Sequence, residues 1–153
     1  MLNGEGLRTV LWVAGCSHHC PQCHNPVTWD INGGLVFDEQ AKEELFEELK
    51  KDYVSGVIFS GGDPFHLENR EEIGALAKEI REKFPDKTIW LYTGYEWEEI
   101  CHLSFLSNID VIVDGKFKIE EKDNNLHWKG SANQRVIDVK ASLRAGEVRL
   151  YQE

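Results

Sequence analysis

The clearest structural pattern lies in residues 54–95, "VSGVIFSGGDPFHLENREEIGALAKEIREKFPDKTIWLYTGY". Two apolar runs, at 54–64 and 88–95, each lead into a glycine-containing turn, and a helical pattern separates them. Asn69 and Glu72 have the spacing of a capping box, which marks the start of a helix. One helical stripe of apolar residues follows, made of Ile73, Leu76, Ala77, Ile80 and Phe84. This order predicts two buried parallel strands joined by a right-handed crossover.

The same alternation continues on both sides of this unit. Further strands are predicted at 9–15, 109–117 and 134–139, and helices at 37–51 and 96–106. The whole chain, residues 1–153, is therefore predicted to form one α/β domain with a parallel sheet of about five strands. Ligands of such folds bind at the carboxyl ends of the strands. Because "GGDP", "TGY" and "DGK" follow three of the predicted strands, we expect a site at this edge of the sheet.

Composition narrows the range of partners. The 153 residues include 27 acidic and 17 basic ones, a formal charge of −10. Phosphate backbones and anionic lipids repel such a chain, so we expect neither nucleic acid nor a membrane as partner. The segment "LWVAGC" (11–16) is similar to a lipoprotein cleavage box, but the start of the chain is barely basic and the apolar run is short. We expect a cytoplasmic protein.

Three of the four cysteines lie in "GCSHHCPQCHN" (15–25), with the spacing C-x3-C-x2-C. Thiolates are the usual ligands of iron–sulfur clusters, and three of them can hold three irons of a [4Fe–4S] cluster while the fourth iron stays open. A structural zinc, completed by one histidine of the loop (His18, His19 or His24), is an alternative. A thioredoxin-like "CPQC" (20–23) is a weaker one, because it leaves Cys16 unexplained.

The turn after the second predicted strand, "SGGDP", contains two glycines and an acidic residue. Glycines allow a small ligand to approach the backbone closely, and Asp63 could accept a hydrogen bond from an amine. A plain strand-to-helix turn would have the same composition. Taken together with the cysteine loop, the turn resembles the radical S-adenosylmethionine (SAM) superfamily. That resemblance implies an incomplete, TIM-like barrel of about five strands.

The chain is more closely similar to the anaerobic ribonucleoside-triphosphate reductase activating proteins, a family of glycyl-radical activases. The similarity includes "NGEGLRTVLWVAGC", "WLYTGY", "VDGKF" and "WKGSANQRVID" and extends over nearly the whole chain. It implies a [4Fe–4S] cluster on Cys16, Cys20 and Cys23. It also implies a SAM site whose residues are Gln22, Cys23, His24, Gly61, Gly62, Asp63, Asp114 and Lys116. For the last two, this chain has "DGK" where the pyruvate formate-lyase activase pattern reads "DLK".

The resemblance implies a reaction as well. The reduced cluster gives one electron to SAM, which splits into methionine and a 5′-deoxyadenosyl radical, and this radical takes hydrogen from a glycine of the partner reductase. A flavodoxin-type protein is the expected electron donor. The open flank of an incomplete barrel is expected to admit the glycine loop. Two alternatives remain, namely activation of another glycyl-radical enzyme and a zinc-stabilised binding module without catalysis.

Some residues have no clear assignment from the sequence. Cys101 lies beside Ile100 in a helical pattern and is predicted to be a buried apolar residue. Trp128, Asn133 and Arg135 belong to the family-specific segment. They could shape the SAM pocket, form a docking surface or pack the last strand.

Overall fold

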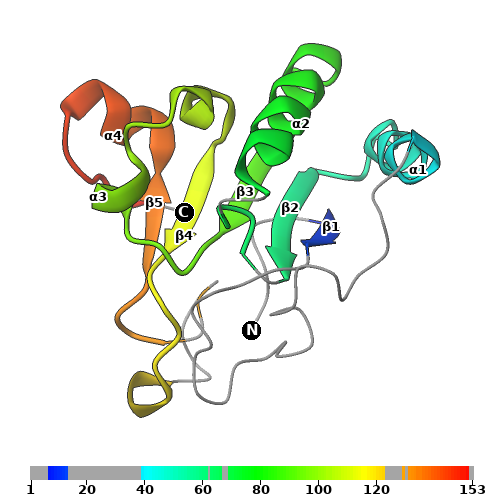
Figure 1. Ribbon diagram of the computed structural model, residues 1–153. Coiled ribbons are helices and arrows are strands. Elements are labelled where there is room, and N and C mark those ends of the chain that lie inside the picture. The colour runs from blue at the N-terminus through cyan, green and yellow to red at the C-terminus, as the bar shows by residue number, and fades with distance from the viewer. Residues whose placement is uncertain are drawn as a thin grey trace.

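The structure, a computed structural model, describes residues 7–13, 39–61, 63–66, 69–122, 129 and 131–151. Its strands are β1 (Arg8–Val13), β2 (Gly56–Gly61), β3 (Thr88–Tyr92), β4 (Val111–Asp114) and β5 (Arg135–Asp138). Its α-helices are α1 (Glu39–Leu49), α2 (Arg70–Lys83), α3 (Trp97–Ile100) and α4 (Val139–Ala145). The described ranges also contain the short 3-10 helices η2 (Ser104–Asn108) and η3 (Ile119–Glu121), and Figure 1 shows how the strands and α-helices are arranged. None of the helices in these ranges has the length and apolarity needed to span a bilayer.

The strands form one five-stranded sheet in the order β1-β2-β3-β4-β5. The first four strands are parallel, as predicted, but β5 is antiparallel to β4. The prediction of a parallel fifth strand was therefore wrong. A parallel neighbour requires a crossover connection, whereas the segment after β4 turns back on itself and forms an antiparallel bridge between Lys122 and Ser131. The sheet is mixed.

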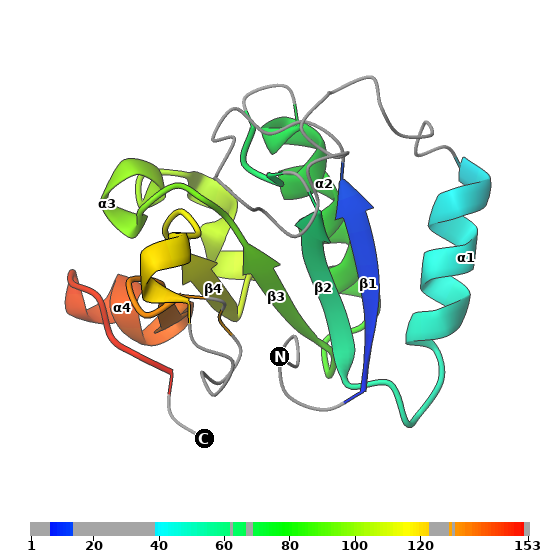
Figure 2. The same cartoon turned by 90° about the horizontal axis from the view of Figure 1, so that it is seen from below.

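The four α-helices of the described ranges pack against the same face of the sheet. The main core contains residues of every helix together with Val57, Phe59, Ile89, Leu91, Ile112 and Ile137 from the strands. Figures 1 and 2 show α1 and α2 on this side of β1, β2 and β3. On the opposite face, Ile58, Trp90 and Val111 form a second, smaller buried cluster, with Tyr151 against the Trp90 ring. Burial on both faces explains why β2, β3 and β4 read as continuous apolar runs.

Two local predictions about the helices were wrong. The side chain of Asn69 does not cap α2: the backbone of Asn69 is in the helical region (φ −100°, ψ −22°) rather than the extended one typical of a cap, and its amide N–H donates to the backbone oxygen of Asp63 at 3.3 Å. A capping box is present at the start of α3, where Glu96 and Glu99 bond reciprocally to the backbone. Cys101 is exposed rather than buried, since α3 ends at Ile100 and that residue occupies the core position.

The close contact between α2 and η2 depends on Gly74. A Cβ atom at this position would lie 2.6 Å from the ring of Phe105, which packs on Phe65 at a centroid distance of 5.9 Å. We expect Gly74→Ala to lower the free energy of unfolding by about 1–2 kcal/mol, because overpacking outweighs the gain in helix propensity. Urea denaturation measures this change. Adding Phe105→Leu should recover part of the loss, and a Gly74→Ala protein more stable than wild type would contradict the packing argument.

Candidate functional site

The polar side chains of the site lie at the edge of the sheet where β2, β3 and β4 end. Asp63 follows β2, Thr93 follows β3, and Asp114 is the last residue of β4. Because β5 runs in the opposite direction, its first residue, Arg135, lies at this same edge and pairs with Asp114. The antiparallel strand thus adds a cation to an edge that the parallel strands line with carboxylates.

Asp63 connects the turn after β2 to the loop after β3. Its carboxylate is 1% exposed and accepts hydrogen bonds from the backbone N–H of Phe65 at 2.9 Å and of Gly94 at 2.9 Å. The Thr93 hydroxyl donates to the same carboxylate at 2.7 Å. A buried carboxylate is costly unless such donors surround it. Asp63 therefore fixes the shape of the glycine turn relative to β3.

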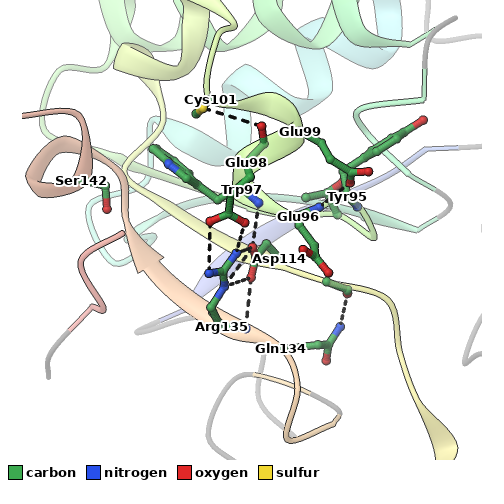
Figure 3. A network of polar contacts seen from close by, with 12 residues as sticks. Tyr95, Glu96, Trp97, Glu98, Glu99, Cys101, Asp114, Gln134, Arg135 and Ser142 are labelled. Atoms are coloured by element: carbon green, nitrogen blue, oxygen red, sulfur yellow. Dashed lines mark hydrogen bonds and ion pairs between the residues drawn. The ribbon is translucent and has the colours of Figure 1, made fainter. Parts of the chain in front are cut away.

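Asp114 is the centre of a second polar network, in which Arg135 points toward both Asp114 and Glu98 (Figure 3). The Asp114 carboxylate, 1% exposed, accepts from the backbone N–H of Trp97 at 2.8 Å and from the Arg135 guanidinium through Nε and Nη2. Arg135 also contacts the more exposed Glu98, with 2.9 Å between Nη2 and Oε1. Arg135 therefore neutralises a buried carboxylate and joins β4, β5 and α3.

The contacts within this network shift the pKa values of Arg135 and Glu98. Hydrogen bonds from Arg135 to Asp114 and then to Glu98 raise the pKa of Arg135 above its ordinary value. The hydrogen bond from Arg135 lowers the pKa of Glu98 below its usual range. Because a guanidinium is charged at any physiological pH, Arg135 remains a cationic partner for both carboxylates.

The family-specific segment "GSANQR" holds the turn after β4. The Asn133 side chain donates to the backbone oxygen of Lys116 at 2.8 Å, and the Gln134 side chain donates to that of Gly115 at 2.9 Å. Gly115 has a φ of 95°, a conformation that residues with a side chain rarely adopt. The glycine in "DGK" is thus required by the turn. Asn133 and Arg135, whose roles the sequence left open, both tie β5 to the end of β4.

The predicted site residues fall into two groups. Gly61, Asp63 and Asp114 lie at the same edge of the sheet, and Lys116 follows on the turn after β4 with its side chain exposed. The remaining ones, Cys16, Cys20, Gln22, Cys23, His24 and Gly62, lie outside the described residues, as does Trp128. In the described ranges, no cluster of His, Cys, Asp or Glu could hold a metal ion.

Sequence reasoning missed Thr93 as a site residue. Its position after the apolar run of β3, in "TGY", was visible, but its bond to Asp63 joins residues 30 positions apart. Glu98 was missed for a similar reason, since it meets Arg135 across 37 positions. No local pattern predicts contacts of this separation.

Comparison with known proteins shows which class of protein this chain belongs to. The family model of the 4Fe-4S single cluster domain matches residues 2–137 of this chain, which therefore belongs to that family of domains. Among curated relatives, the anaerobic ribonucleoside-triphosphate reductase-activating protein of Enterobacteria phage T4 is 44% identical over 135 residues, covering 88% of this chain and 86% of the relative. Its namesakes in Haemophilus influenzae and Escherichia coli (strain K12) are each 39% identical over 140 residues. These two alignments cover 89% of this chain and 90% or 91% of the relative.

Within that class, the chain belongs to the family of anaerobic ribonucleoside-triphosphate reductase-activating proteins. No solved structure matches it significantly.

Proposed function

We propose that this chain activates an anaerobic ribonucleoside-triphosphate reductase by radical SAM chemistry, as a single domain in the cytoplasm. Cys16, Cys20 and Cys23 would hold a [4Fe–4S] cluster, a donor set that suits the matched iron–sulfur family model. The remaining iron would bind SAM. When bound, the reduced cluster supplies the electron that splits SAM into methionine and a 5′-deoxyadenosyl radical, which takes hydrogen from a glycine of the reductase. A flavodoxin-type protein would deliver the electron.

The pairing of β1 with β2 carries this proposal. Val13, the last residue of β1, is paired with Gly61, the last residue of β2. Cys16 follows Val13 by three residues in the sequence, and three residues of chain span at most about 11 Å. The chain therefore leaves β1 beside the end of β2, and we infer that a ligand on the cluster would be within reach of the glycine turn.

The residues at this edge of the sheet would have different roles in binding SAM. Gly61, Gly62 and Asp63 would form the turn that meets the amino group, and the segment Gln22–His24 would border the ligand from the cysteine loop. Asp114 and Lys116 are the proposed contacts on the β4 side. Because Asp114 is buried against Arg135 and Trp97, the exposed Lys116 is the one whose charge can meet SAM directly.

The helix arrangement supports a partial TIM-like barrel for this sheet. In the part of the chain that the structure describes, the strands are in consecutive order and the α-helices lie on one face, as in the wall of an α/β barrel, whereas a doubly wound sheet has helices on both faces. The face with Trp90 and Tyr92 would then line the inside. A partner's glycine loop would enter from that side.

Anaerobic reconstitution with ferrous iron and sulfide tests the proposal. We expect a brown protein with broad absorption at about 400 nm, from charge transfer between thiolate and iron. With a reductant and SAM, it should release 5′-deoxyadenosine and methionine, and it should give the purified reductase a glycyl-radical signal in electron paramagnetic resonance. A colourless protein with stoichiometric zinc would refute cluster chemistry. Cleavage of SAM without a radical on the reductase would point to another glycyl-radical enzyme.

A further inference from the structure

The hydroxyl group of Thr93 makes two hydrogen bonds, one as donor and one as acceptor. Thr93 follows β3, is 5% exposed, and donates to Oδ1 of Asp63 at 2.7 Å. The same hydroxyl accepts from the backbone N–H of Tyr95 at 3.2 Å. Only a group that both donates and accepts can do this, and among side chains of similar size serine and threonine have one. Valine would have the same shape but would deprive both neighbours of a partner.

Asp63 passes the effect of Thr93 to the glycine turn. One carboxylate oxygen accepts from Thr93 and from the N–H of Phe65, two residues along the turn. The other accepts from the N–H of Gly94. The carboxylate is thus shared between the turn after β2 and the loop after β3, so its orientation sets the distance between them.

The loop after β3 is held on its other side as well. The N–H of Trp97 donates to Asp114 at 2.8 Å, and the N–H of Gly115 donates to the backbone oxygen of Tyr95 at 3.1 Å. Residues 93–97 are therefore fastened between two buried carboxylates. These bonds restrain the loop that carries Thr93, so the Thr93 hydroxyl is kept in place to donate to Asp63.

We propose that Thr93 is a positioning residue, which orients Asp63 through its hydroxyl group and thereby sets the glycine turn for SAM. That SAM binds at this turn rests on the proposed function. The hydrogen bond between Thr93 and Asp63, called the latch below, is observed independently of that function. The binding site is disturbed when the latch is opened, while the cluster and the reacting atoms remain as they were. The KM for SAM should therefore respond more strongly than kcat.

The test compares Thr93→Val with Thr93→Ser in the full chain. Losing one charge-assisted hydrogen bond should raise the KM for SAM about tenfold in Thr93→Val at nearly unchanged kcat, and Thr93→Ser should retain the wild-type value. Thr88→Val, the same change at the other end of β3, is the matched control. If Thr93→Val does not fold, Thr93→Ala takes its place.

Amide hydrogen exchange in protein without iron or SAM provides the second readout. The N–H groups of Phe65 and Gly94 should exchange about tenfold faster in Thr93→Val than in wild type, Thr93→Ser or Thr88→Val. Unchanged exchange in Thr93→Val, or equal impairment in Thr93→Ser, would overturn the latch. An unchanged KM with faster exchange would overturn its role toward SAM. A wild-type protein that does not cleave SAM would refute the proposed function, and exchange would still decide whether the latch exists.

Discussion

Replacing Cys20 with alanine is expected to reduce the iron–sulfur absorption and the glycyl-radical signal on the partner reductase to background. The three thiolates of this loop are the proposed protein ligands of the cluster, each on one of its four irons. The loss of one thiolate leaves two irons without a protein ligand. The measurements are the iron and sulfide content after anaerobic reconstitution and the radical signal after incubation with reductase, SAM and a reductant. Replacing Cys16 or Cys23 should have the same effect, and these three changes should reduce activity more than any other single change.

Cys101→Ala is the matched control for this experiment. Cys101 is an exposed cysteine just after α3, so its removal should change neither the iron content nor the radical signal. A Cys20→Ala protein that retained full iron content and radical signal would refute the assignment of the cluster to residues 15–25. Equal losses in both variants would indicate damage unrelated to the loop.

Replacing Arg135 with methionine is expected to have the largest effect on stability. The change leaves the Asp114 carboxylate, which is 1% exposed, without its guanidinium partner. Removing one partner of a buried ion pair costs about 3 kcal/mol or more, a large part of the roughly 5–15 kcal/mol that stabilises a typical domain. Urea denaturation followed by tryptophan fluorescence measures the loss.

Two further variants show whether the buried charge causes this loss. The Glu98 side chain is 60% exposed. Glu98→Gln removes its charge from Arg135 and should lower the free energy of unfolding by less than about 1 kcal/mol. Combining Arg135→Met with Asp114→Asn removes both charges while the amide oxygen can still accept from the N–H of Trp97, so part of the stability should return. If the double variant were less stable than Arg135→Met alone, the charge argument would fail.

The strands were predicted well because their signal is local. Runs of apolar residues identify a strand that is buried on both faces, and the prediction of 88–95 contains the observed β3 (Thr88–Tyr92). The direction of β5 was not predictable in the same way, since a strand has the same residue pattern whether it runs parallel or antiparallel. Its direction follows from the connection after β4, which turns back on itself instead of crossing over.

The errors at Asn69 and Cys101 both concern the ends of helices. The spacing of Asn69 and Glu72 satisfies the capping-box pattern, but the backbone of Asn69 is helical rather than extended, and its amide N–H donates to the glycine turn. Cys101 follows the helical pattern of its neighbours, but α3 ends one residue earlier. In both cases the spacing matched a local rule, but the backbone conformation of Asn69 and the burial of Ile100 beside Cys101 decided the outcome.

The amino-acid order alone specifies the spacing of the three thiols, the alternation of strands and helices, and the glycine turn, because each is a property of neighbouring residues. Folding brings about the rest. Asp63 meets Thr93 across 30 positions and Asp114 meets Arg135 across 21, and these bonds exist because the strand ends converge on one edge and β5 enters it from the opposite direction. Hydrogen bonds between distant segments depend on how strands are paired, and that pairing is a property of the whole sheet rather than of any short stretch of the chain.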